Sequence, residues 1–144
     1  MCKAKRKSRQ PTSESVTPFL APIQALQSLL SAFHNRGVII GGVAVSLLGA
    51  PRYTVDLDAV FLLTMEDVPR LLAEAANHGI EPRISDPIAF AHKSQVLLLR
   101  HTASGTDIDL SLGSLPFEVE MVERARVVEI GSVRLRLQIG RAHV

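Results

Sequence analysis

The sequence predicts a single α+β domain in which helices pack on one face of a mixed β-sheet. Short runs of β-branched and other apolar residues, typical of strands, alternate along the chain with segments whose apolar residues recur every three to four positions, as in helices. A chain of 144 residues with 47% hydrophobic residues can bury one proper core. The sequence has no internal repeat, so one domain is expected.

A basic tail precedes the first expected helix. Residues 1–16 are rich in Lys, Arg and Ser and lack an amphipathic period, so we expect them to be disordered. Such an arm can attract nucleic acid nonspecifically, or it can simply solubilise the chain. Thr17 as N-cap and Pro18 at the first helical position then open a helix that stops before Gly37. Its inward residues are expected to be Phe19, Ile23, Leu26, Leu30 and Phe33.

The later elements are expected from alternation, caps and glycines. They are a strand at residues 38–40, a helical segment at 43–48, a strand at 55–63, a helix at 65–78, a hairpin of strands 96–99 and 106–112, a helix starting at Pro116, and a hairpin of residues 127–130 and 133–137. Thr64 and Asp67 resemble a cap for the helix at 65–78. In the helix at Pro116, we expect Phe117, Met121 and Val122 to face inward.

A glycine pair, Gly41-Gly42, follows the first expected strand and opens a helical segment. Glycine lets phosphate oxygens approach backbone N–H groups, and the positive end of the helix dipole also favours an anion. This arrangement suits a nucleoside triphosphate. A plain tight turn is the alternative interpretation of the two glycines.

Two acids follow the glycines within the same strand-helix-strand unit. Alternation sends Asp56 and Asp58 to one face of their strand, where the two negative charges repel each other. Mg²⁺, a hard cation that prefers oxygen ligands, would hold them together, whereas a solvated strand end is the plain alternative. In the strand at 106–112, Asp107 and Asp109 share a face, and either could complete a carboxylate trio.

Three residues between the glycines and the acids are further candidates for nucleotide binding. Arg52 can neutralise triphosphate oxygens or pair with a carboxylate of the site, and Thr54 can donate a hydrogen bond nearby. Ser46 lies one turn into the helical segment, where it would reach either a phosphate or the core. For Arg52, a salt bridge that anchors the loop remains the alternative. Lys93 and Arg100 are weaker candidates for a cation that faces the substrate.

The sequence contains, in order, an apolar run, a Gly-Gly pair, an Asp-apolar-Asp motif and a later strand Asp. This pattern resembles the nucleotidyltransferase signature of the DNA polymerase beta superfamily. Two stretches resemble the AbiEii/AbiGii toxin-like group: GGVAVSLLGAPRYTVDLD and, after it, IDLSLGSLPFEVEMVERARVVEIGSVRLRL. The resemblance implies a polymerase-beta-like nucleotidyltransferase fold over residues 17–138, with Asp109 rather than Asp107 as the third acid. It also implies C-terminal helices that this chain lacks, so we expect a truncated catalytic core.

By this resemblance, the chain would transfer a nucleoside monophosphate from an NTP to an acceptor hydroxyl. Two Mg²⁺ ions would be held by Asp56, Asp58 and Asp109, and the nucleotide by Gly41, Gly42, Ser46, Arg52 and Thr54. The acceptor would be a tRNA or another RNA if the chain is the toxin of a toxin-antitoxin system with an antitoxin partner. Modification of a protein or a small molecule, or nucleotide binding without catalysis, are the alternatives.

Composition and the last residues give the remaining expectations. A single cysteine, Cys2, cannot form a disulfide framework, so a reducing cytoplasm is expected. No apolar run approaches the roughly 18 residues that a membrane helix needs. Residues 139–144, IGRAHV, resemble the translation of a sequencing adapter, and we expect them to be an artefact outside the fold.

Overall fold

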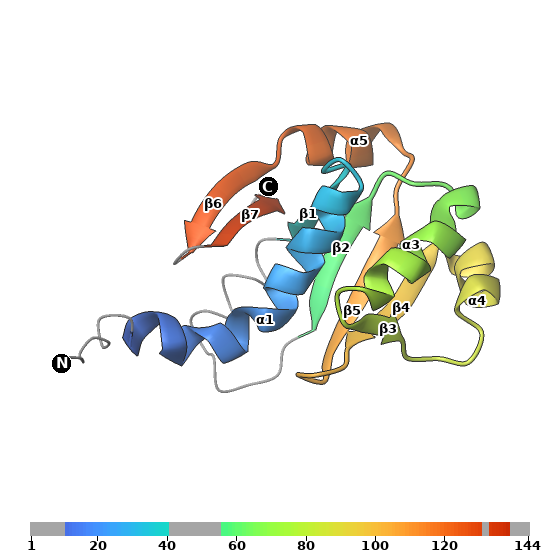
Figure 1. Cartoon of the computed structure of the whole chain (residues 1–144). Helices are drawn as coiled ribbons and strands as arrows, with labels where there is room; N and C mark the ends of the chain where they lie inside the picture. The colour runs from blue at the N-terminus through green and yellow to red at the C-terminus, as the bar shows by residue number, and fades with distance from the viewer. Residues whose placement is uncertain (1–10, 41–55, 131–132, 139–144) are drawn as a thin grey trace.

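The structure is a computed structural model that describes residues 11–40, 56–130 and 133–138. These residues form seven strands, four α-helices and one 3₁₀ helix around a single sheet (Figure 1). In chain order the elements are α1 (Pro11–Ala32), β1 (Gly37–Ile40), β2 (Leu57–Phe61), η2 (Met65–Asp67), α3 (Val68–Ala76), β3 (Ile80–Pro82), α4 (Pro87–Ser94), β4 (Val96–His101), β5 (Thr106–Leu112), α5 (Pro116–Glu123), β6 (Arg126–Ile130) and β7 (Val133–Gln138).

The sheet is mixed, as the sequence predicts, with strand order β3-β4-β5-β2-β1-β7-β6. The strand pairs β2–β5 and β1–β7 are parallel, and the other neighbouring pairs are antiparallel. The two predicted hairpins are present as β4–β5 and β6–β7. The α+β class with a mixed sheet is therefore confirmed.

The main core lies between one face of the sheet and the helices α1, α3 and α4. Alternate residues of the central strands point into this core because side chains alternate along a strand. In β2 these are Leu57, Ala59 and Phe61, and in β5 they are Ile108, Leu110 and Leu112. The helices contribute the apolar stripe Ile23, Leu26, Leu29, Leu30 and Phe33 from α1, Leu71 and Ala75 from α3, and Ala91 from α4.

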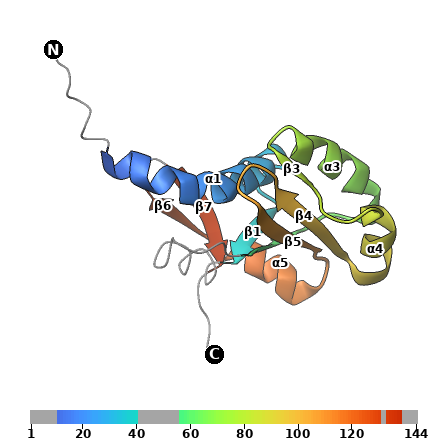
Figure 2. The same ribbon diagram turned by 90° about the horizontal axis from the view of Figure 1, so that it is seen from below.

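Helix α5 covers the opposite face of the sheet, so the expectation that the helices pack on one face is wrong. Val122 of α5 is buried against Val38 of β1 and Val60 of β2, which alternate away from the main core. Figure 2 shows α5 on one side of the strands and α1 and α3 on the other. The central strands bury apolar residues on both faces, and the second face therefore needs a cover of its own.

Several element boundaries and one inward residue differ from the expectations. Helix α1 begins at Pro11, within the segment assigned to the disordered tail, because Pro11 can also occupy a first helical turn. Phe117 is 59% exposed, although Val122 of the same helix is buried as expected. The capping arrangement is confirmed at η2, which leads into α3: the Asp67 carboxylate accepts hydrogen bonds from the Thr64 N–H and hydroxyl, and these bonds lower the pKa of Asp67.

Two short elements were not expected from the sequence. Helix α4 begins at Pro87 after Asp86, whose carboxylate accepts a hydrogen bond from the Ala89 N–H at 3.2 Å, and that pair is a recognisable helix start. Strand β3 has only three residues and ends at Pro82, so its alternation is too short to detect. It forms the edge of the sheet beside β4.

No helix in the described part of the chain combines the length and the apolar character needed to cross a bilayer.

Candidate active site

Asp58 and Asp109 are directly opposite each other on two neighbouring parallel strands. The register of β2 and β5 pairs Asp58 with Asp109, between the pairs Leu57–Ile108 and Ala59–Leu110. Those four flanking residues point into the main core, so the two aspartates share the opposite face of the sheet. Neighbouring parallel strands lie about 4.8 Å apart, which brings the two carboxylates within reach of one ligand.

The electrostatics of Asp58 reflect this crowding. Partial burial, followed by the carboxylates of Asp109 and Asp56, raises the pKa of Asp58 above its ordinary value. Asp56 is exposed and directly precedes β2, two residues from Asp58. All three causes disfavour the ionised form of Asp58. A cation beside Asp58 would therefore stabilise its ionised carboxylate.

Arg83 supplies a fixed positive charge at Asp109. Its Nη2 donates a hydrogen bond to Asp109 Oδ1 at 2.7 Å, and the Arg83 side chain is 17% exposed. Its Nη1 donates to the backbone carbonyls of Leu99, at 2.6 Å, and Ile108, at 3.3 Å. Three acceptors on two strands therefore hold the guanidinium, which in turn fixes the orientation of the Asp109 carboxylate.

Asp107, on the same face of β5, shares Arg83 with Asp109 but has Arg100 as its closer partner. Its Oδ1 accepts a hydrogen bond from Arg100 Nε at 2.8 Å across the β4–β5 hairpin, and Arg83 Nε is 3.8 Å from its Oδ2. The register pairs Asp107 with Arg100 and pairs Asp109 with Asp58 on the other side. Of the two candidates on β5, Asp109 is therefore the one paired with Asp58 of β2.

No protein-family model and no curated protein matches the chain.

Five predicted nucleotide-binding residues lie outside the described part of the chain. These are Gly41, Gly42, Ser46, Arg52 and Thr54. The described chain leaves β1 at Ile40, and β1 is antiparallel to β2 with Ile39 opposite Ala59. The last described residue of β1 is therefore at the same end of the sheet as Asp58.

The donor set fits Mg²⁺ in its chemistry. Asp58 and Asp109 offer carboxylate oxygens from adjacent strands. Burial, and then the neighbouring carboxylates, raise the pKa of Asp58, and a divalent cation would stabilise its ionised form. As the side chains lie, no group of three or more His, Cys, Asp or Glu residues within residues 11–40, 56–130 and 133–138 is placed to hold a metal ion. Asp58 and Asp109 form the centre of this candidate site, and Asp56 adds a negative charge just before β2.

Arg83 is the site residue that the sequence did not reveal. The two cations named as weaker candidates lie elsewhere: Lys93 is exposed on α4, and Arg100 pairs with Asp107. Arg83 directly follows β3, and its backbone N–H donates to the Leu98 carbonyl of β4 at 3.1 Å. Near Arg83, the only signal in the sequence was Gly79, which marks the end of the helical segment. It indicates that the chain turns there, but it does not point to Arg83 itself.

Proposed function

We propose that the chain is a Mg²⁺-dependent nucleotidyltransferase that moves a nucleoside monophosphate from an NTP to an acceptor hydroxyl. The observation that carries this proposal is the register of Asp58 with Asp109 on two parallel strands. Like charges directly opposite each other destabilise a sheet, so their presence on one face favours a role in binding a cation. The resemblance of the Gly-Gly and Asp-apolar-Asp pattern to nucleotidyltransferases supports the same reaction.

The described residues would perform two tasks in this reaction. Asp58 and Asp109 would hold Mg²⁺ through their carboxylate oxygens, with Asp56 adding negative charge beside them. Mg²⁺, when bound, neutralises triphosphate charge and lowers the pKa of an attacking hydroxyl. Arg83 would keep the Asp109 carboxylate in one orientation while substrate binds.

The bond changes are those of a nucleotidyl transfer. The acceptor oxygen forms a bond to the α-phosphorus, the bond from that phosphorus to the bridging oxygen breaks, and pyrophosphate leaves. The proton of the acceptor hydroxyl passes to a base or to solvent. We propose RNA as the acceptor class, following the resemblance to toxin-like nucleotidyltransferases.

A labelling experiment tests this function. The protein is incubated with Mg²⁺ and each α-labelled nucleotide, with either total RNA or protein extract as the acceptor. We expect label in RNA, and we expect Asp58→Asn and Asp109→Asn to lower the rate by at least about 100-fold, since each removes a proposed ligand.

Asp107→Asn is the matched control, because it removes a carboxylate from the same strand and the same face. It should keep most of the activity. Label in protein alone would reassign the acceptor, and an absence of label in every fraction, with all variants folded by circular dichroism, would contradict the proposed reaction.

A further inference from the structure

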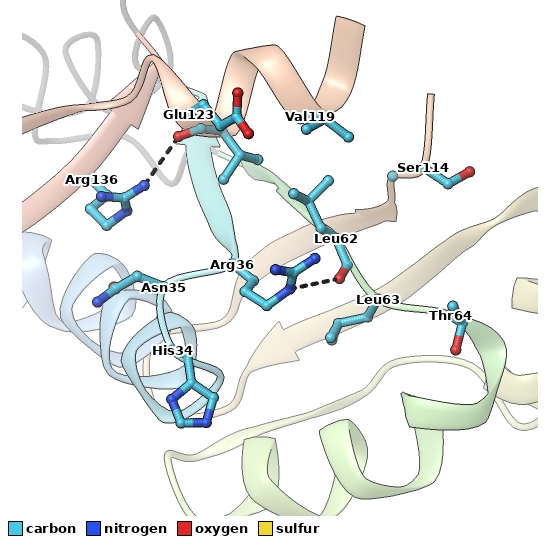
Figure 3. Close-up of a pocket in the computed structure, with 12 residues that line it drawn as sticks. His34, Asn35, Arg36, Leu62, Leu63, Thr64, Ser114, Val119, Glu123 and Arg136 are labelled. Atoms are coloured by element: carbon cyan, nitrogen blue, oxygen red, sulfur yellow. Dashed lines mark hydrogen bonds between the residues drawn. The ribbon is translucent and has the colours of Figure 1, made fainter. Parts of the chain in front are cut away.

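A second candidate site lies at the other ends of the two strands that carry the aspartates. A pocket of about 560 Å³ is lined by residues that follow β2 and β5, by α5, by β7 and by the turn between α1 and β1 (Figure 3). Leu62, at its wall, is four residues from Asp58, a separation of about 13 Å at roughly 3.3 Å per residue. The volume is within the ordinary range of small-molecule pockets.

The wall of this pocket is partly apolar and partly cationic. Leu62, Leu63, Val119 and Val122 supply the apolar surface. Arg36 and Arg136 also line it, and Glu123 is the single carboxylate among its lining residues. The balance of fixed charge at the pocket therefore favours an anion, and it offers no carboxylate pair that would hold a divalent cation.

Arg136 enters the pocket from β7 with unused hydrogen-bonding capacity. Its Nη2 donates to the Val122 carbonyl of α5 at 3.1 Å, and its backbone N–H donates to Gln27 Oε1 of α1 at 2.7 Å. Its Nε is buried and finds no acceptor among the described residues. Arg136 therefore brings to the pocket a guanidinium whose donors the described residues satisfy only in part.

Arg36 reaches the pocket from the turn after α1. His34 and Asn35 both adopt left-handed backbone conformations, with φ of 59° and 57°, and this turn redirects the chain towards β1. The Leu62 N–H donates to the Arg36 carbonyl at 2.7 Å, which fixes the Arg36 backbone against the end of β2. Figure 3 shows the Arg36 side chain in the middle of the pocket, with its Nε directed at the Leu62 carbonyl, 3.5 Å away.

We propose that this pocket binds a small amphiphilic anion, a carboxylate or phosphate monoester carried on an apolar body. The planar guanidinium groups match the paired oxygens of such an anion, and the four apolar side chains accept the body. The inference does not depend on the nucleotidyltransferase proposal, because none of the three aspartates lines the pocket.

A titration of the full chain, followed by backbone amide NMR, tests the proposal with four probes. Phenyl phosphate and phenylacetate each carry an anionic group on an apolar ring. The two half-probes carry one feature each: inorganic phosphate has only the anionic group, and benzyl alcohol has the ring without a charge. At least one of the first two should shift the amides of Leu62, Ser114 and Val119 saturably, with a Kd at least about tenfold below that of either half-probe. Which one binds more tightly identifies the anionic group.

Three variants locate the binding. Arg36→Met should raise the Kd at least about tenfold, because a charge-assisted hydrogen bond is lost. Arg134→Met is the matched control: Arg134 is on β7, its side chain is 71% exposed, and its partner is Glu129. The Kd of that variant should stay within about twofold. Glu123→Gln, a change at an exposed residue, should tighten binding because it removes the only carboxylate of the lining.

Equal shifts by all four probes, an absence of saturable shifts, or a Kd that Arg36→Met and Glu123→Gln both leave unchanged would each overturn the proposal.

Discussion

The carboxylate of Asp58 is in an unfavourable electrostatic environment without a bound cation. It is partly buried, it is opposite Asp109, and it follows Asp56 by two residues. Arg83 relieves this repulsion on one side only, because it pairs with Asp109. The energetic cost of the site is therefore concentrated at Asp58.

Neutralising Asp58 should stabilise the protein in the absence of metal. The pKa of Asp58 is raised in the folded state above the ordinary value of 3.8, so the unfolded state loses this proton first as pH rises. Ionised Asp58 consequently lowers the free energy of unfolding at neutral pH, and this cost vanishes as pH falls below the unfolded pKa. Urea denaturation should show Asp58→Asn more stable than wild type near neutral pH, with the difference closing in acid. A variant less stable than wild type at neutral pH would contradict this.

Arg83→Met should lower the free energy of unfolding by about 1 to 2 kcal/mol. The substitution removes the donor to Asp109 and to the carbonyls of Leu99 and Ile108, although partial exposure of Asp109 lets water replace some of the loss. The control is Arg100→Met, whose side chain is 48% exposed and pairs with Asp107, and which should cost less than about 1 kcal/mol. Equal losses in urea denaturation would mean that Arg83 is an ordinary surface ion pair.

The sequence was sufficient to name Asp58 and Asp109 but insufficient to name Arg83. Alternation along a strand tells which residues share a face, so it identified Asp58 but left Asp107 and Asp109 as alternatives on β5. Only the family resemblance favoured Asp109. The contact between Arg83 and Asp109 spans 26 residues and depends on β3 joining the sheet edge. Local patterns carry no information about such a contact.

Elements with a strong local signal were predicted well. Hairpin β4–β5 has clear alternation and turn residues, and η2, which leads into α3, has the Thr64–Asp67 cap. Helix α5 was predicted with the correct start, but not with the correct face of the sheet or with an exposed Phe117. A helix of two turns has too few residues to define its apolar face, and only packing against Val38 and Val60 decides it.

Gly37 determines how closely α1 approaches the sheet. A Cβ at this position would clash with Leu30 Cδ2, would lie 2.7 Å from the Val60 carbonyl oxygen, and would lie 2.9 Å from Phe61 Cδ1. Gly37→Ala should therefore lower the free energy of unfolding by about 2 kcal/mol or more, since backbone and core atoms must move.

Gly105→Ala is the control for the glycine substitution itself. Gly105 has φ of +78° and no atom within 4 Å of an added Cβ, so its variant should lose only the roughly 1 kcal/mol of backbone strain. Urea denaturation of both variants measures the comparison. An equal loss in the two would show that close packing at Gly37 is unimportant.

At the scale of the whole molecule, one pair of parallel strands connects two chemically different regions. Asp58 and Asp109 give an acidic region suited to a cation, and the pocket near Arg36 and Arg136 is suited to an anion. Helix α5 packs on the face of the sheet to which the aspartates also project. The sequence pattern indicated the first region, whereas the second combines residues from five separate segments and has no local signature.

The measurement that tests the central claim most directly is the effect of Mg²⁺ on the midpoint of thermal unfolding. A ligand that binds only the folded state stabilises it by about 2.7 kcal/mol at a hundred times its Kd. We predict that Mg²⁺ raises the midpoint of the wild type and of Asp107→Asn, and that it raises the midpoints of Asp58→Asn and Asp109→Asn little or not at all. An equal rise in all four proteins, or no rise in the wild type, would contradict the assignment of Asp58 and Asp109 as one metal-binding pair.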